Sequence, residues 1–248
     1  MTDYYNPFSL VDKTILITGA SSGIGRAITV ECTKMGAIVI AVGRNQSRLE
    51  ETKSMCKQGN CSLYTCDITK KKEIEQLILS IPPLDGVVHC AGIGQRILCK
   101  QLREIDIDNI LDINFKATVL LQTGLLTEKR IKKGASIVFV SSMASWSPSI
   151  GNSIYSASKG AISSFASCLS LELAPRQIRV NCISPAMVLT KLILQDGLDE
   201  EILKQDEKKY PLGRYGSPND IAYLAIYLLS DTSRWMTGSN IKISGGAK

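Results

Sequence analysis

The sequence has little that would support a metal centre or a membrane span. It contains a single histidine, His89, and its eight cysteines include no Cys-x-x-Cys pair. Zinc sites need closely spaced Cys and His ligands, so we expect no bound metal. No run reaches the about 18 to 20 apolar residues of a spanning helix. Residues 1–8 lack a basic stretch followed by an apolar run, so we expect neither membrane association nor a signal peptide.

The cysteines follow the hydrophobic pattern of the chain, which argues against a disulfide framework. A free thiol inside an apolar run behaves as a small hydrophobic side chain. We therefore expect buried, reduced thiols and a cytoplasmic location, where disulfides are rare. The five cysteines in such runs are Cys32, Cys66, Cys90, Cys168 and Cys182.

Aromatic residues are scarce, at 6% of the chain, and the net charge is a modest +6. No basic cluster is interleaved with aromatic residues, so we expect no nucleic-acid partner. Most of the basic residues are expected to be solvated helix ends. The alternative is attraction of an anionic partner, such as a phosphate-bearing cofactor or an acidic carrier protein.

The chain alternates short β-rich apolar runs with longer helical patterns, without a repeat or a linker. This alternation is typical of a parallel sheet covered by helices on both faces. We predict one α/β domain spanning residues 1–248, a Rossmann-like, doubly wound sheet of seven parallel strands. The predicted strands cover residues 14–18, 38–42, 62–66, 86–90, 136–141, 179–183 and 240–243. Predicted helices follow the first strand and cover residues 48–55, 72–79, 107–126, 153–173 and 219–229.

A glycine-rich turn joins the first strand to the first helix. It reads Gly-Ala-Ser-Ser-Gly-Ile-Gly over residues 19–25, a position that holds the pyrophosphate of a dinucleotide in such sheets. Glycines allow a sharp turn and close approach to phosphates, and the helix N-terminus favours negative charge. The alternative is a tight connection without a ligand. The predicted phosphate-binding residues are Gly19, Ser21, Ser22, Gly23, Ile24 and Gly25.

The end of the second strand indicates which dinucleotide binds. NAD sites place an acidic residue there to accept from the ribose hydroxyl. This strand instead ends with Arg44, whose guanidinium suits a phosphate, although a surface arginine without a role is the alternative. We predict NADP(H) as the cofactor.

Three residues form a candidate catalytic set. Tyr155 and Lys159 are four apart on a predicted helix and so share one face. A nearby ammonium favours the phenolate form of a tyrosine. Ser142 is predicted to end the fifth strand, at the edge where open α/β sheets build their sites. Tyr-x-x-x-Lys pairs are common on helix surfaces, and it is the glycine turn that makes this pair informative.

Together these motifs resemble the short-chain dehydrogenase/reductase family over nearly the whole chain. The resemblance implies that Tyr155 exchanges the proton, Ser142 orients the carbonyl, Lys159 binds the nicotinamide ribose and Asn114 holds a relay water. It places Asp67 and Ile68 near the adenine. It also assigns cofactor contacts to Ala91, Gly92, Tyr155, Lys159, Pro185, Val188 and Thr190.

The chain departs from the family pattern at three places. The usual Asn-Asn-Ala-Gly reads His-Cys-Ala-Gly over residues 89–92, Ala186 replaces a common glycine, and Ser244 replaces a common aspartate. We interpret His89 as structural or cofactor-adjacent rather than as a general base. None of these changes removes a predicted catalytic atom.

The substrate is less well indicated. The pattern is closest to the 3-oxoacyl-[acyl-carrier-protein] reductases, which implies reduction of a carrier-linked or small-molecule ketone. A sugar, steroid or polyketide substrate is the alternative, and a non-catalytic NADP-binding regulator is a third. Lys133 and Arg176 match basic positions that receive the carrier in those relatives, whereas segments 94–101, 143–154 and 187–210 should set selectivity. Trp146 is expected to be a pocket wall or a subunit contact.

The predicted helix over residues 153–173 is rich in small side chains. Family members assemble through this helix, so the resemblance implies a homotetramer, with a dimer as the alternative. The small residues are Ser156, Ala157, Gly160, Ala161, Ser163, Ser164 and Ala166.

Overall fold

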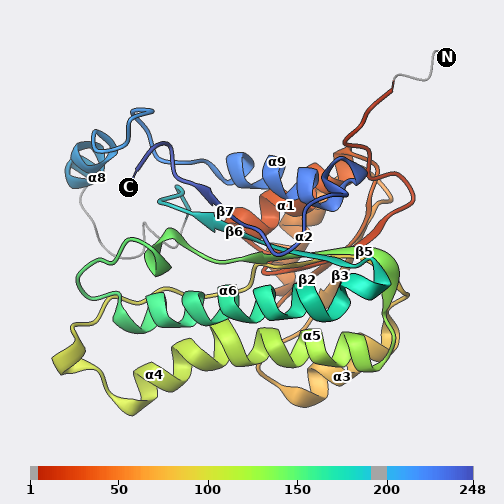
Figure 1. The fold of residues 1–248 in the computed structure, drawn as a ribbon, viewed down its shortest axis with the longest axis horizontal. Coiled ribbons are helices and arrows are strands. Elements are labelled where there is room, and N and C mark those ends of the chain that lie inside the picture. The colour runs from red at the N-terminus through yellow and green to blue at the C-terminus, as the bar shows by residue number, and fades with distance from the viewer. Residues whose placement is uncertain (1–4, 191–199, 248) are drawn as a thin grey trace.

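The computed structural model describes residues 5–190 and 200–247, and within them seven parallel strands form one sheet. The sheet order is β3-β2-β1-β4-β5-β6-β7, the doubly wound arrangement that the sequence predicts (Figure 1). The strands are β1 (Thr14–Thr18), β2 (Ile38–Gly43), β3 (Cys61–Thr65), β4 (Leu84–His89), β5 (Ile131–Val140), β6 (Arg179–Pro185) and β7 (Asn240–Ile243).

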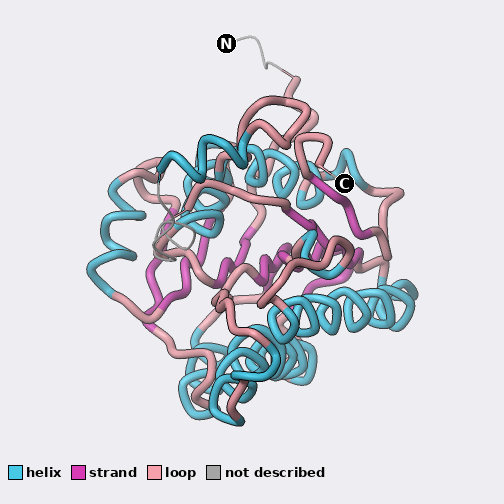
Figure 2. Tube along the Cα trace, turned by 90° about the vertical axis from the view of Figure 1, so that its left-hand side faces the viewer, coloured by secondary structure: helices cyan, strands magenta, loops and turns pink. Residues whose placement is uncertain are grey.

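Helices connect the strands and cover both faces of the sheet (Figures 1 and 2). The last helix has the clearest start signal in its local sequence. Ser217 caps it, and Pro218 occupies its first position. The helices are α1 (Gly23–Lys34), α2 (Gln46–Ser54), α3 (Lys71–Ser80), α4 (Glu104–Leu111), α5 (Ala117–Thr127), α6 (Ser153–Leu173), α8 (Glu200–Glu207) and α9 (Pro218–Leu229).

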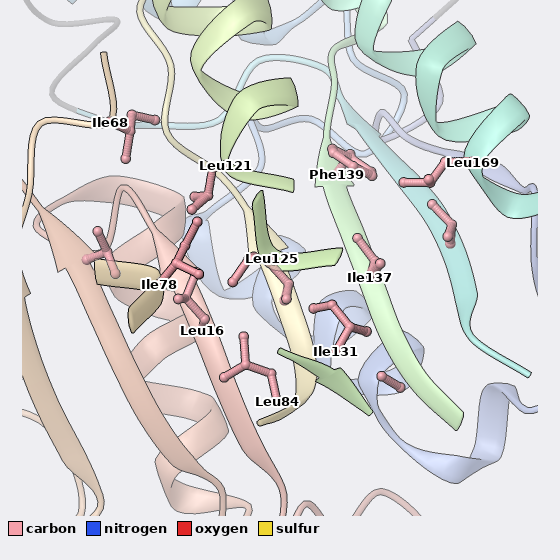
Figure 3. Close-up of a cluster of buried hydrophobic side chains, with 14 of the residues drawn as sticks. Leu16, Ile68, Ile78, Leu84, Leu121, Leu125, Ile131, Ile137, Phe139 and Leu169 are labelled. Carbon is pink, nitrogen blue, oxygen red and sulfur yellow. The ribbon is translucent and has the colours of Figure 1, made fainter. Parts of the chain in front are cut away.

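The core lies on both faces of the sheet because successive strand residues point to opposite sides. In β1, Leu16 faces the layer of α3, α5 and α6, whereas Ile15 and Ile17 face α1 and α9. Figure 3 shows the first layer, where Leu121 and Leu125 of α5 approach Leu16. Burial on both faces explains why the central strands are almost continuously apolar.

The predicted helix over residues 107–126 is wrong in one respect, because the structure divides it. α4 begins at Glu104, a π-helical turn covers Asp112–Lys116, and α5 follows. π-helical turns are rare and are frequently found at functional sites. This turn carries Asn114, which is buried, so tertiary contacts rather than local periodicity decide the break.

One of the cysteines predicted to be buried is exposed. All eight are free thiols, and Cys32, Cys61, Cys66 and Cys182 are buried. Cys168, however, is exposed, because α6 carries a second stripe of small and apolar residues that faces away from the sheet. Within the described residues no helix is long and apolar enough to cross a membrane, and no three His, Cys, Asp or Glu side chains gather as metal ligands.

Candidate active site

A cleft of about 870 Å³ opens at the carboxyl edge of the sheet. The order of strands reverses between β1 and β4, which is where doubly wound sheets bind ligands. All sixteen residues predicted to contact the cofactor line this cleft, and so does Ser142. Asn114 is the one predicted site residue that does not line it. The structure therefore brings together segments that are far apart in the sequence.

The glycines of the turn are required by close backbone contacts. A Cβ on Gly25 would lie 2.3 Å from the Gly19 carbonyl oxygen, and one on Gly19 would lie 2.9 Å from the Ala91 nitrogen. Gly19 and Gly23 also adopt positive φ angles of 69° and 52°, a region that side chains disfavour. The turn is thus a cradle that any larger residue would fill.

Side chains from neighbouring elements hold the turn in place. The Thr18 hydroxyl accepts hydrogen bonds from the Cys90 and Ala91 amides, both at 3.1 Å. From α2, the Thr52 hydroxyl donates to the Ala20 carbonyl at 2.9 Å. These bonds fix the ends of β1 and β4 relative to α2 and so hold the shape of the cradle.

The N-terminus of α1 is open toward the cleft. Its N-cap, Ser22, makes no side-chain hydrogen bond to the helix, and the first turn carries no acidic residue. The orphan amides and the positive end of the helix dipole are therefore available to an anion. Thr190 lies directly over the turn, because its methyl carbon is 3.2 Å from the position of a Cβ on Gly23.

Two arginines border the end of the cleft formed by β2 and β3. Arg44 follows β2 and Arg48 lies in the first turn of α2; both are exposed and line the cleft. Neither side chain donates a hydrogen bond to another residue that the structure describes. Burial opposes ionisation of Asp67, but hydrogen bonds from Thr69 and the charge of Arg44 outweigh it and lower the pKa of its carboxyl. The sequence indicated Arg44 but missed Arg48.

Asn114 joins two segments of the site by hydrogen bonds. Its amide nitrogen donates to the Ile93 carbonyl at 2.9 Å and to the Ser158 hydroxyl at 3.1 Å. Its amide oxygen accepts from the Ile93 nitrogen at 2.8 Å. The Ser158 hydroxyl in turn donates to the Tyr155 carbonyl at 2.7 Å. The side chain thus joins the segment after β4 to the helix that carries Tyr155.

Lys159 is a buried cation at the floor of the cleft. Its side chain is held by one hydrogen bond, in which the ammonium donates to the Val140 carbonyl at 2.9 Å, and it meets no carboxylate among the described residues. The same nitrogen is 3.3 Å from the position of a Cβ on Gly92. Burial raises the pKa of the nearby thiols of Cys90 and Cys182 to about 12 despite the lysine. Both thiols are therefore neutral, and the charge of Lys159 is available to groups in the cleft.

Ser142 and Tyr155 face the same cleft from two elements. β5 ends at Val140, one residue before its predicted end at Ser141. Ser142, predicted to end the strand, instead caps a 3₁₀ turn over Met143–Ser145. Its hydroxyl oxygen accepts from the Ala144 nitrogen at 3.1 Å, which leaves the hydroxyl proton to donate. The Tyr155 hydroxyl makes no hydrogen bond within the described residues.

His89 lies in the core rather than in the cleft. Its ring stacks on Phe139 at 4.7 Å between centroids, and its Nε2 lies 2.9 Å from the Gln122 amide oxygen. Burial lowers the pKa of His89 to about 4, against a weaker opposing effect of the Gln122 bond. A buried, neutral ring without access to the cleft has a packing role.

The two cations predicted to receive a carrier do not line the cleft of their own chain. Lys133 lies near the start of β5, and Arg176 follows the end of α6, where it donates to the Ile131 carbonyl at 2.6 Å. β5 runs from Ile131 to Val140, so Lys133 lies near the opposite end of this strand from Ser142. Their role toward a carrier stays a prediction. Trp146 is not a lining residue of the cleft either; Lys242 of β7 lies 4.2 Å from its ring centroid.

Three charged residues that line the cleft were not predicted individually from the sequence. Asp206 and Lys209 belong to α8 and the turn after it, and Arg96 to the segment after β4. All three lie in segments predicted to set selectivity. Those segments are mostly apolar, and the sequence did not indicate that the three charges come close together. Residues 191–199 of segment 187–210 lie outside the described residues. A further polar lining residue is Asn152, just before α6.

The glycine cradle, the open helix N-terminus and the paired arginines fit a nicotinamide dinucleotide. A family model described as enoyl-(acyl carrier protein) reductase matches residues 19–248. A 3-oxoacyl-[acyl-carrier-protein] reductase of Rickettsia felis is 35% identical over 237 residues, covering 96% of this chain and 97% of the relative.

The chain belongs to the short-chain dehydrogenase/reductase family.

Other members of the family are similar as well. An NAD-dependent glycerol dehydrogenase of Listeria innocua is 34% identical, with 96% of this chain and 95% of the relative covered. A crystal structure of a Brucella melitensis short-chain dehydrogenase/reductase, described as a glucose/ribitol dehydrogenase, superimposes with a TM-score of 0.90 at 27% identity. It covers 97% of this chain and 98% of that one. The chain is thus an oxidoreductase of a family that acts on alcohols and ketones, whereas the relatives differ in the substrates that their names give.

Proposed function

We propose that the protein reduces a ketone to a secondary alcohol with NADP(H), and that a 3-oxoacyl thioester is its substrate. The observation that supports this best is the position of Lys159: a buried cation without a carboxylate, on the helix of Tyr155 and beside Gly92 of the cofactor segment. Such a charge has no structural counterpart to neutralise it, so it is expected to act on groups within the cleft.

In this proposal the bound nicotinamide supplies the hydride for the carbonyl carbon. Ser142 donates its free hydroxyl proton to the carbonyl oxygen and so orients it. Tyr155 transfers its phenolic proton to the same oxygen, and the Lys159 ammonium stabilises the phenolate that remains. Asn114 positions Tyr155 through Ser158, is anchored to the backbone of Ile93, and does not touch the substrate.

Arg44 is the proposed NADP determinant, supported by Arg48 at the same end of the cleft. Replacing Arg44 with Ala should weaken NADPH binding about 10- to 100-fold and NADH binding less than about twofold, since a charge-assisted bond to the additional phosphate is worth roughly 1.5–3 kcal/mol. Fluorescence titration with both cofactors measures this. Arg234, exposed and outside the cleft, provides the control variant Arg234→Ala. Equal losses for both cofactors would contradict the assignment.

The reductase of R. felis supports a 3-oxoacyl thioester as substrate, and the glycerol and glucose/ribitol dehydrogenases favour a polyol or sugar as the second candidate. A regulator without activity is less well supported, because Ser142, Tyr155 and Lys159 all line the cleft.

An NADPH oxidation assay separates these candidates. We expect kcat/KM for acetoacetyl thioesters to exceed that for L-xylulose or dihydroxyacetone at least about tenfold, because a cleft that fits the transition state discriminates by a few kcal/mol. Comparable values for the sugars would favour the second candidate instead.

We further propose a homotetramer in the cytoplasm, with a dimer as the alternative. The outward stripe of α6 supports assembly: its exposed members include Ala157, Ser164, Cys168 and Leu171 at helical spacing. Leu171 is 77% exposed, which is unfavourable for an apolar side chain unless a partner covers it. Eight free thiols support a reducing compartment.

A further inference from the structure

The cleft has a charged rim formed by Arg96, Asp206 and Lys209, of which Arg96 and Lys209 are exposed. Its charged members come from two separate segments: Arg96 follows β4, and Asp206 and Lys209 belong to α8 and the turn behind it. None of these three residues is among those proposed to contact the cofactor, so they are available to the part of a substrate that extends away from its reacting carbonyl.

The backbone at Arg96 is held against the loop that leads into α6. The Ile97 nitrogen donates to the Gly151 carbonyl at 2.9 Å, and the Cβ of Arg96 is 3.7 Å from the position of a Cβ on Gly151. The side chain is exposed at the rim and makes no hydrogen bond or ion pair within the described residues. Its position is therefore fixed at the backbone, while its guanidinium is open to a ligand.

The acidic residue of the rim is already engaged. One oxygen of Asp206 pairs with the Lys209 ammonium at 2.8 Å, and the other accepts from the Tyr215 hydroxyl at 2.7 Å. Against the effect of burial, the Lys209 bond, the Tyr215 bond and the charges of Lys209 and Arg96 lower the pKa of the Asp206 carboxyl. Arg96 and Lys209 thus bring two positive charges against the one negative charge of Asp206, so the rim carries a net positive charge. Both Asp206 oxygens are already bonded, and the five donors of Arg96 remain unused.

We propose that Arg96, assisted by Lys209, binds the phosphate in the arm of a thioester substrate and is the specificity determinant for phosphate-bearing acyl groups. The planar guanidinium matches phosphate in a bidentate geometry, and Arg is favoured wherever such recognition matters. A short 3-oxo acid carries its carboxylate next to the reacting carbonyl and so within the cleft, not at its exposed rim. This assignment rests on the proposed reduction of a 3-oxoacyl thioester.

The test compares two thioesters that differ in their phosphates. Acetoacetyl-coenzyme A carries them, and acetoacetyl-N-acetylcysteamine is neutral. In Arg96→Ala we expect KM for the coenzyme A ester to rise at least about tenfold with kcat nearly unchanged, because the lost bond is made equally in the ground and transition states. KM for the neutral ester should stay within about twofold, and Arg96→Lys should restore part of the loss.

Lys208 offers a matched control, because it is exposed on the same segment but does not line the cleft. Lys208→Ala should leave both KM values unchanged. Equal effects of Arg96→Ala on the two thioesters would overturn the role of Arg96 and leave the proposed function intact. A selective loss with acetoacetate would show a carboxylate ligand and overturn the phosphate assignment. Wild-type protein that reduces neutral ketones but neither thioester would refute the proposed substrate itself.

Discussion

Replacing Tyr155 with Phe is expected to lower kcat at least about 1000-fold, because the substitution removes only the hydroxyl proposed to exchange the proton and general acid catalysis contributes roughly 10²–10⁴-fold. The ring still packs at its half-buried position on α6, so the protein should fold normally. NADPH should bind with a Kd within about threefold of the wild-type value. Single-turnover reduction and cofactor titration together separate the two effects.

Tyr223→Phe is the matched control for this prediction. Tyr223 lies on α9, is 56% exposed and does not line the cleft, so Tyr223→Phe should retain full activity. Wild-type kcat in Tyr155→Phe would show that another group supplies the proton. Loss of cofactor binding in the same variant would show that the hydroxyl serves the cofactor site instead.

Replacing Gly25 with Ala is expected to weaken NADPH binding at least about 100-fold. The new Cβ would lie 2.3 Å from the Gly19 carbonyl oxygen, a contact that forces the turn and the start of α1 apart. The amides that face the cleft would then be displaced, and fixed donors lose most of their value when they move by about 1 Å. Isothermal titration with NADPH and thermal unfolding of the free protein measure binding and folding separately.

Gly160→Ala is the corresponding control. A Cβ there meets only Ser145 at 3.8 Å, an ordinary contact, and Ala favours a helix interior over Gly by about 1 kcal/mol. This variant should bind NADPH normally and be at least as stable as the wild type. Tight binding in Gly25→Ala would mean that the glycine turn does not hold the cofactor phosphates.

Strand positions were predictable where local pattern and tertiary role coincide. β1 and β7 have the bounds that the sequence predicts, because apolar runs flanked by turn residues leave no alternative. β5, in contrast, begins five residues before its predicted start. Its first residues include Lys132, Lys133 and Gly134, which are exposed, and an exposed strand start carries no apolar signal.

The same distinction holds for the site. The glycine turn and the Tyr155–Lys159 pair could be read locally, because each depends on spacing within one segment. The meeting of Arg96 with Lys209 could not, since these residues are more than 100 positions apart and only the fold joins them.

The hydrogen bonds of Asn114 restrict which side chains this position can accept. A leucine of similar volume would leave the Ile93 amide, the Ile93 carbonyl and the Ser158 hydroxyl without their partner. An aspartate would lose the two donors and add a negative charge close to the Lys159 ammonium. Only a short side chain that both donates and accepts hydrogen bonds keeps the segment after β4 fixed against the helix that carries Tyr155.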